Sequence, residues 1–316
     1  IKGILRIAGG AKRANPERTE LEIMMRALRD SNVTKFVNAD VGIFLGLVND
    51  IFPKMQDATK QADPIMTKAV RDVLKENKVH IKNGYQEGLQ LQPEDIFVGK
   101  TVDLAELLGI RHCVFALGCA GSGKTCVWKT LQAAQTHLKQ GDGPTLVNAL
   151  NPKAVTSDDL YGFVHPVTKE PFDGIIAKIM RDFKNATGAQ LNVPKWVMLD
   201  GDIDAEWIES MNTVMDDNKV LTLVSNERIP LSRSMRLIFE ISNLKNGSPA
   251  TVSRAGVLFL NETDVGWGAY FQSWVDNLCA KNAHIDTKEQ AWLEALVQQY
   301  VPPTLDNMRK NKWMHL

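Results

Sequence analysis

One octapeptide constrains the fold of this 316-residue chain more than any other feature. It follows an apolar run, Cys113–Leu117, and opens a helical segment, Thr125–Leu138. Its spacing, Gly-x-x-x-x-Gly-Lys-Thr, is typical of a phosphate-binding turn between a strand and a helix. The eight residues are Gly118, Cys119, Ala120, Gly121, Ser122, Gly123, Lys124 and Thr125.

The residue types in this loop suit the phosphates of a nucleotide. Glycines let the backbone curl so that several N–H groups point at phosphate oxygens, and the start of the helix adds its positive end. Lys124 can place its ammonium between the terminal phosphates, and the hydroxyl of Thr125 can ligate Mg²⁺. We therefore expect ATP or ADP to bind here together with Mg²⁺.

After Pro93, strand-like apolar runs alternate with helical segments. This alternation predicts an α/β fold with a mostly parallel five-stranded sheet flanked by helices. Leu221–Val224 and Arg228–Leu231 predict a hairpin inserted into that pattern. The expected strands are Cys113–Leu117, Thr145–Ala149, Trp196–Leu199, Arg236–Ile241 and Val257–Leu260.

Residues 1 to about 88 predict a small helical subdomain that precedes the sheet. Thr19 and Glu22 have the spacing of a capping box, and apolar residues follow at helical intervals. Asn83-Gly84 indicates a turn. We expect this region to carry no catalytic chemistry of its own.

An acidic residue follows the strand Trp196–Leu199. Asp200 is the expected partner of the phosphate loop, with its carboxylate holding the Mg²⁺ shell. In ATPases that hydrolyse, a Glu that orients the attacking water commonly comes next, whereas here the next residue is Gly201. Asp202 or Asp204 could substitute for that Glu, or could belong to a solvated turn or a helix N-cap.

Composition excludes some classes of partner. Lys plus Arg and Asp plus Glu both number 37, so the formal net charge is zero, which argues against a nucleic-acid binder that depends on a large basic surface. The longest apolar stretch, Val41–Phe52, is too short to span a bilayer. We therefore expect neither nucleic acid nor a membrane as a partner. The four cysteines match no zinc spacing and read as thiols in a reducing compartment.

Several longer segments resemble the dynein heavy chain, and in particular the second of the AAA+ modules in that motor's ring. An Asp-Gly pair at Asp200-Gly201 is characteristic of that module. Ile1–Gly9 and Arg26–Asp30 look like the helical lid of the first module. The sequence of Arg26–Asp30 resembles the axonemal (ciliary) branch more than the cytoplasmic branch. The other matching segments are Asn151–Thr156, Asp159–Gly162, Asp200–Glu209, Met211–Lys219 and Ser248–Gly256.

The resemblance implies a division of the chain and further site residues. It implies a lid over residues 1–88, an AAA+ large subdomain over 89–272, and a helical connection that starts the following lid over 273–316. Asn243 falls at the family's sensor position near the terminal phosphate, although a turn-forming Asn is the alternative. Arg254 falls at the arginine finger, which reaches the nucleotide of the neighbouring module, although a structural ion pair is the alternative.

Other residues carry weaker signals. Phe97 and Val98 are candidate walls for the adenine ring, with an ordinary core contact as the alternative. His165 reads as part of a surface turn before Pro166, and neither His165 nor Tyr161 fits a general-base arrangement. We expect the Trp residues at 128, 196, 207, 267 and 274 to pack in the core or at interfaces.

These features imply a module that binds Mg·ATP with little hydrolysis and supplies Arg254 to its neighbour. The alternatives are a self-sufficient NTPase that uses Asp202 or Asp204, and a structural ring segment that binds nucleotide weakly. The resemblance implies neighbouring AAA+ modules of the same heavy chain as partners, with the microtubule and the dynein intermediate and light chains reached through the rest of the motor. It also implies the cytoskeleton of the cytoplasm, and the axoneme of a cilium or flagellum in particular.

Overall fold

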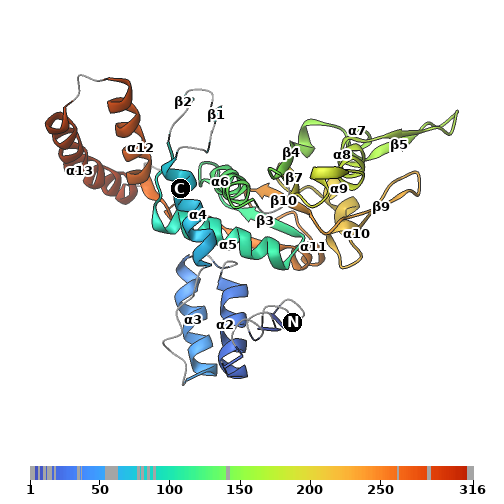
Figure 1. Cartoon of the computed structure of the whole chain (residues 1–316), viewed down its shortest axis with the longest axis horizontal. Coiled ribbons are helices and arrows are strands. Elements are labelled where there is room, and N and C mark those ends of the chain that lie inside the picture. The colour runs from blue at the N-terminus through green and yellow to red at the C-terminus, as the bar shows by residue number, and fades with distance from the viewer. Residues whose placement is uncertain are drawn as a thin grey trace. The chain divides into compact units, whose positions relative to one another are not determined.

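The structure is a computed structural model, and its residues cluster into two compact units (Figure 1). The first unit combines Ile1–Val79 with Pro93–Gly266, and the second combines His80–Gln92 with Trp267–Leu316. The structure describes residues 4–5, 8–9, 12, 16–17, 19–33, 36, 38–53, 63–76, 79, 82–83, 86–87, 90–139, 143–261, 263–282 and 286–311.

A parallel sheet of five strands forms the centre of the first unit as described, in the order β11-β3-β10-β7-β4. This confirms the predicted fold class. Apolar and β-branched residues fill these strands, as expected for a sheet that is covered on both faces. The strands are β3 (Cys113–Leu117), β4 (Leu146–Leu150), β7 (Lys195–Asp200), β10 (Met235–Ile241) and β11 (Gly256–Phe259).

The strand order places β10 between the strand that precedes the phosphate loop and the strand that ends in Asp200. The register aligns Glu240 of β10 with Asp200 of β7, and Ile241 with Leu117 of β3. Because all these strands are parallel, their carboxyl ends lie at the same edge of the sheet. Candidate residues at these three strand ends are therefore brought together.

Three helices form a layer beside the sheet, and one of them, α5, contacts two of its strands. Helices α4, α5 and α6 pack on one another, and α5 also contacts β3 and β11. Arg71 of α4 pairs with Asp95 at the start of α5, with 2.5 Å between Nη2 and Oδ1. These helices are α4 (Pro64–Lys75), α5 (Asp95–Ile110) and α6 (Lys124–His137), and α6 confirms the helix expected after the phosphate loop.

A large apolar cluster fills the space between the sheet and the remaining helices. Phe239 of β10 packs against Phe115 and Trp207, with ring centroids 5.0 and 6.1 Å apart. Trp128, Trp196 and Trp207 are all buried, which confirms them as packing residues. The other elements here are η1 (Pro152–Ala154), α7 (Ser157–Tyr161), α8 (Ile175–Lys184), η2 (Gly188–Gln190), α9 (Ala205–Ile208), η3 (Glu209–Met211), α10 (Asn212–Met215) and α11 (Pro249–Arg254).

Two antiparallel hairpins extend from this core. The pair β8 (Val220–Thr222) and β9 (Arg228–Pro230) confirms the hairpin predicted from sequence. The pair β5 (Gly162–Val164) and β6 (Pro171–Asp173) was not predicted. Gly162 makes that second hairpin possible, because its φ is 92° and a Cβ there would lie 2.2 Å from the carbonyl oxygen of Phe172.

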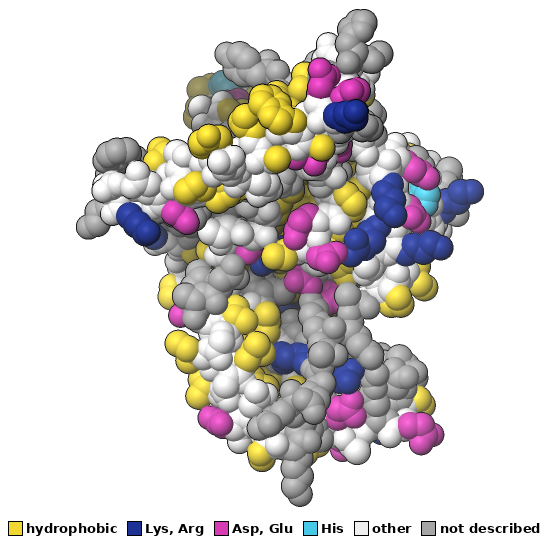
Figure 2. Space-filling view, turned by 90° about the vertical axis from the view of Figure 1, so that its left-hand side faces the viewer, with side chains coloured by type: hydrophobic (Ala, Val, Ile, Leu, Met, Phe, Trp, Pro, Cys, Tyr) yellow, Lys and Arg dark blue, Asp and Glu magenta, His cyan; other side chains and the backbone are white. Residues whose placement is uncertain are grey.

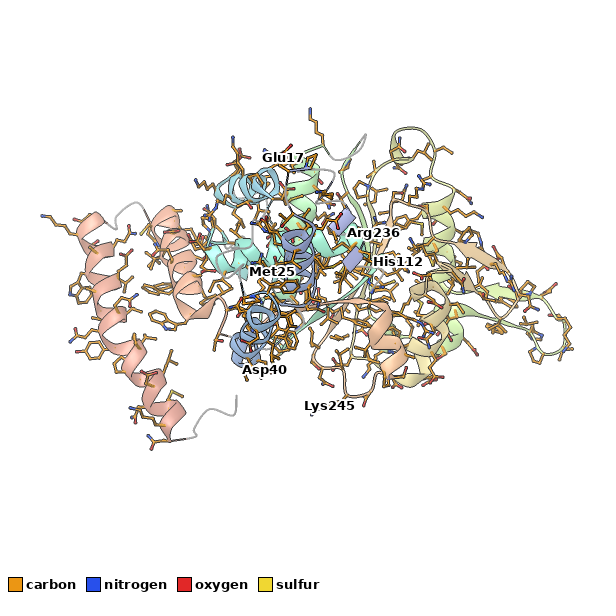
Figure 3. The ribbon with its side chains drawn as sticks, turned by 90° about the horizontal axis from the view of Figure 1, so that it is seen from below. Glu17, Met25, Asp40, His112, Arg236 and Lys245 are labelled. Atoms are coloured by element: carbon orange, nitrogen blue, oxygen red, sulfur yellow. The ribbon has the colours of Figure 1, made fainter. Side chains whose placement is uncertain are left out.

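The N-terminal segment is helical as expected where it is described. Helices α2 (Glu20–Val33) and α3 (Asn38–Ile51) lie side by side (Figures 1 and 3) and bury Met25 against Val48. The backbone N–H of Glu22 donates to Thr19 Oγ1 at 3.3 Å, which is one half of the predicted capping box. Much of Ile1–Gly9, and Gly84 of the predicted turn, lie outside the described residues.

The second unit contains two long helices and one short strand pair. The strands β1 (Lys82–Asn83) and β2 (Gln86–Glu87) are antiparallel and correct the expectation of a purely helical region up to residue 88. Helices α12 (Gly266–Lys281) and α13 (Thr287–Lys310) expose aromatic side chains, and Figure 2 shows exposed hydrophobic groups beside charged ones. In the part of the chain that is described, no helix combines the length and apolarity needed to cross a bilayer.

Candidate nucleotide-binding site

The phosphate loop follows β3 directly and continues into α6. Gly121 and Gly123 have φ values of 84° and 89°, a region that side-chain-bearing residues rarely adopt. A Cβ on Gly118 would lie 2.3 Å from the backbone oxygen of Leu260 and 2.6 Å from Ser122 Oγ, so only glycine fits there. The loop therefore has the curled backbone that the sequence predicts.

Lys124 and Ser122 give this loop its polar groups. The ammonium of Lys124 donates to the carbonyl oxygens of Gly118 and Cys119 at 2.7 and 2.8 Å. Among the described residues, the buried hydroxyl of Ser122 has no hydrogen-bond partner. The Lys124 ammonium can exchange these neutral carbonyl acceptors for an anionic phosphate oxygen at little cost. Hydrogen bonds between two charged groups are stronger than those to a neutral carbonyl.

Thr125 contacts a carboxylate that the sequence reasoning did not single out. Its hydroxyl donates to Glu240 Oε2 at 2.9 Å, and the indole N–H of Trp128 donates to Glu240 Oε1. Glu240 is 5% exposed. Burial raises the pKa of this carboxyl, the two hydrogen bonds oppose the rise, and the nearby charge of Asp200 adds to it.

A signal for Glu240 was present in the sequence. It is a charged residue inside an otherwise apolar central strand, and a buried charge requires partners. The run Arg236–Ile241 predicts a strand, and strand character alone assigns no role to the carboxylate within it.

Asp200 lies where the sequence predicts, at the carboxyl end of β7, and its side chain is exposed. Gly201 follows, and a Cβ at Gly201 would meet Asn151 Oδ1 at 3.0 Å and Pro152 Cδ at 3.2 Å. The side chain of Asn151 thus occupies the space beside Gly201 and also accepts from the backbone N–H of Lys153 at 2.9 Å.

Asp202 and Asp204 both have internal hydrogen-bond partners. Asp202 Oδ1 accepts from the backbone N–H and the hydroxyl of Ser242 at 2.7 and 2.6 Å. These bonds from Ser242 lower the pKa of Asp202. Asp204 Oδ1 accepts from the N–H of Glu206 at 3.2 Å at the start of α9. In this arrangement Asp202 joins the end of β7 to the end of β10, and Asp204 caps a helix.

Asn243 is exposed just beyond β10, two residues after the strand ends. Its amide donates to Ser242 Oγ at 3.1 Å, and its oxygen accepts from the N–H of Lys245 at 3.1 Å. Both bonds are local and suit a turn. The side chain nevertheless lies at the same sheet edge as Asp200, so a sensor role stays a prediction.

Arg254 ends α11 and is partly exposed. Its Nη1 donates to Asn212 Oδ1 at 3.2 Å, and its Nε lies 3.8 Å from Asp216 Oδ1. Both partners belong to the same unit, so the ion pair proposed as an alternative is present. The 3.8 Å separation and the 30% and 45% exposure of the two side chains make that pair weak.

The remaining candidates are buried or make hydrogen bonds within the fold. Phe97 and Val98 lie in the first turn of α5 and are 5% and 2% exposed, so contact with adenine stays a prediction. His165 Nδ1 accepts from two N–H groups of the β5–β6 turn, which confirms a surface turn. Tyr161 donates to the Trp207 carbonyl. All four cysteines are thiols, as expected: Cys113, Cys119, Cys126 and Cys279.

The residues present fit a magnesium nucleotide. Glycines that exclude Cβ atoms form the cradle, and Thr125 and Asp200 supply hard oxygen atoms of the kind Mg²⁺ prefers. Within the described residues, no cluster of three His, Cys, Asp or Glu side chains could hold a metal by itself. Mg²⁺ usually keeps several waters and binds through one or two protein oxygens and the phosphates.

Family models match most of the chain. One described as "Hydrolytic ATP binding site of dynein motor region" matches residues 1–125. A second, "AAA domain (dynein-related subfamily)", matches residues 113–255, which include the phosphate loop and four of the five sheet strands, all except β11.

Individual relatives match nearly the whole chain. It is 48% identical over 309 residues to "Dynein beta chain, ciliary" of Tripneustes gratilla. It is 47% identical to "Dynein axonemal heavy chain 17" of Homo sapiens and 47% identical to "Dynein beta chain, flagellar outer arm" of Chlamydomonas reinhardtii. Each match covers 98% of this chain but only 6% of the relative's length.

Proposed function

The chain belongs to the dynein heavy chain family, and on that premise we propose that it is a nucleotide-binding AAA+ module of an ATP-driven microtubule motor. The observation that carries the proposal is the joining of the phosphate loop to the β7 and β10 ends through Thr125 and Glu240. Mg²⁺ bound here would neutralise phosphate charge, while Lys124 and the loop N–H groups orient the phosphates.

The module binds ATP but hydrolyses it slowly in this proposal. A water-orienting carboxylate is worth roughly 10²–10⁴ in rate. Gly201 lacks one, and Asn151 fills the adjoining space. Asp202 and Asp204, the residues of the self-sufficient NTPase alternative, have their oxygens engaged by Ser242 and Glu206.

Arg254 acts on a neighbouring module as an arginine finger. Support comes from its partial exposure and from the weakness of its contact with Asp216. The ion pair would have to open when a nucleotide on another module approaches, which costs about 0–1 kcal/mol for an exposed pair.

The cellular setting follows from the relatives, whose names place them in cilia and flagella. We propose the same axonemal setting for this chain. Its partners would be neighbouring AAA+ modules, and through the rest of the motor the microtubule and the intermediate and light chains.

The test is Lys124→Ala, with Lys129→Ala on the same helix as the matched control. Loss of the loop cation should weaken Mg·ATP binding about 10- to 100-fold, the range of a hydrogen bond to a charged group. Equilibrium titration of the full 316-residue chain with a fluorescent ATP analogue measures this. Failure of the unmodified chain to bind would favour the alternative of a structural ring segment.

A further inference from the structure

Glu240 holds a buried charge at a place where the fold alone does not require one. It lies on the central strand β10, 5% exposed, among side chains that are otherwise apolar or nearly so. A carboxylate in such a place is costly unless hydrogen bonds satisfy it. Trp128 and Thr125 each donate to a different oxygen of Glu240.

The contact with Glu240 orients the hydroxyl hydrogen of Thr125. A hydroxyl has one hydrogen and two lone pairs. With its hydrogen committed to Glu240 Oε2 at 2.9 Å, the oxygen of Thr125 keeps its lone pairs for another partner. A cation is the partner that suits an oxygen presented in this way.

The neighbouring charge points to the same partner. Asp200 stands opposite Glu240 in the register of β7 and β10. Two carboxylates on adjacent strands repel each other, and a divalent cation between them and the phosphates would relieve that repulsion. Lys124 also interacts with Glu240, but its ammonium donates to the loop carbonyls of Gly118 and Cys119.

We propose that Glu240 is a positioning residue for Mg²⁺, which holds the Thr125 hydroxyl in its metal-ligating orientation and couples metal binding to nucleotide binding. This inference rests on the proposed function, since it needs a nucleotide in the loop. Glu240 acts through Thr125, and its negative charge adds to that of Asp200. Removal of such an outer-shell partner typically lowers metal affinity about 10- to 100-fold.

The experiment measures the ratio of the ATP dissociation constants in EDTA and in saturating Mg²⁺, using the full 316-residue chain. Glu240→Gln should lower that ratio about 10- to 100-fold while affinity in EDTA is kept or improved. Asp200→Asn is the positive control. An unchanged ratio in Glu240→Gln would overturn the proposal, as would an equal loss of affinity with and without Mg²⁺, which would indicate a structural role.

A pair of variants separates charge from hydrogen-bond geometry. Trp128→Phe removes one donor but keeps the carboxylate and its bond to Thr125, so the ratio should fall less than in Glu240→Gln. Trp128→Phe with Glu240→Gln lets the new amide turn its NH₂ away from Thr125, which keeps the acceptor and removes only the charge. This double variant also serves if the single Gln variant does not fold, and a normal ratio in it would show that charge is not needed.

The outcomes for the two proposals are distinguishable. No binding by the unmodified chain in any condition would remove the nucleotide-binding function itself. If binding depends on Lys124 but Glu240→Gln leaves the ratio of the dissociation constants in EDTA and in Mg²⁺ unchanged, only the role of Glu240 is refuted.

Discussion

The two ends of the central sheet use their charged side chains differently. At the amino end, Lys195 is 1% exposed and donates to the carbonyl of Leu191 at 3.0 Å. Arg236 donates from Nε to the carbonyl of Leu108 at 2.7 Å, and the His112 ring bonds the carbonyl of Val214 at 2.8 Å. Figure 3 shows His112 and Arg236 close together at this end.

At the carboxyl end, charge is arranged around a place for phosphate. Thr125, Asp200 and Glu240 lie there. Lys124 donates to loop carbonyls, and its ammonium can exchange these acceptors for an anion. At the amino end, the cationic side chains therefore donate to backbone carbonyls and stabilise the fold. The carboxyl end keeps exchangeable contacts, which is the property a binding site needs.

Arg254 is the residue that could break this comparison, because it is a cation near the amino end, just before β11. Its partners are side chains, Asn212 and Asp216, rather than backbone carbonyls. Arg254→Ala should slow hydrolysis on the neighbouring module about 10³- to 10⁵-fold, the range for arginine fingers. Affinity of this module for its own nucleotide should change little.

The measurement is the microtubule-stimulated ATPase rate of a longer chain that carries the neighbouring module. Arg233→Ala is the matched control, since Arg233 is an exposed arginine of the same region. A normal rate in Arg254→Ala would show that Arg254 is not an arginine finger. Its role would then be structural, like that of the other cations at the amino end.

Gly201 sharpens the comparison at the other end. Gly201→Glu adds the carboxylate that hydrolysing ATPases use, but its Cβ would meet Asn151 Oδ1 at 3.0 Å and Pro152 Cδ at 3.2 Å. Asn151 must therefore shift by a few tenths of an ångström. We expect single-site turnover to rise, by less than the roughly 10²–10⁴ of a well-placed general base.

Gly201→Ala is the control for the steric part of that change, because it adds the same Cβ without the carboxylate. The rate is measured in the longer chain with the other nucleotide sites disabled. Equal turnover in the Ala and Glu variants would show that the missing carboxylate does not limit hydrolysis. Rapid turnover with Gly201 in place would contradict the proposal of slow hydrolysis.

The sequence predicted the sheet well because its strands are short apolar runs bounded by polar or glycine residues. Each of the five lies within one residue of its predicted start and end. The phosphate loop was predictable for a related reason, since glycine at φ near 90° has few substitutes. The β5–β6 hairpin was missed because exposed strands such as Pro171–Asp173 carry no apolar pattern.

The site was less predictable than the fold, because contacts between strands decide it. Asp202 looked like a possible base until its oxygen was found to accept from Ser242, forty residues away. Glu240 meets Thr125 only because β10 lies between β3 and β7. Neither contact can be read from spacing along the chain.

His112 provides the smallest expected effect and tests the amino end alone. Burial lowers its pKa from the usual 6.5, and the positive charges of Lys219, Arg236 and Arg111 lower it further, while the bond to Val214 opposes the shift. The folded protein therefore resists protonation of this ring while the unfolded chain accepts it. Well above pH 6.5 the ring is neutral in both states and contributes no pH dependence.

As the pH falls below that value, the unfolded state takes up the proton first, so the free energy of unfolding falls. The slope due to one such group is at most about 1.4 kcal/mol per pH unit and ends at the lowered pKa of the folded state. His112→Gln keeps an N–H donor for the Val214 carbonyl but does not titrate. Urea unfolding between pH 5 and 7 should give a shallower slope for the variant, by at most one proton, with nucleotide affinity at pH 7.5 unchanged. Equal slopes would show that the His112 ring takes up protons equally in the folded and unfolded states, so that burial does not lower its pKa and the amino end tolerates a charge there.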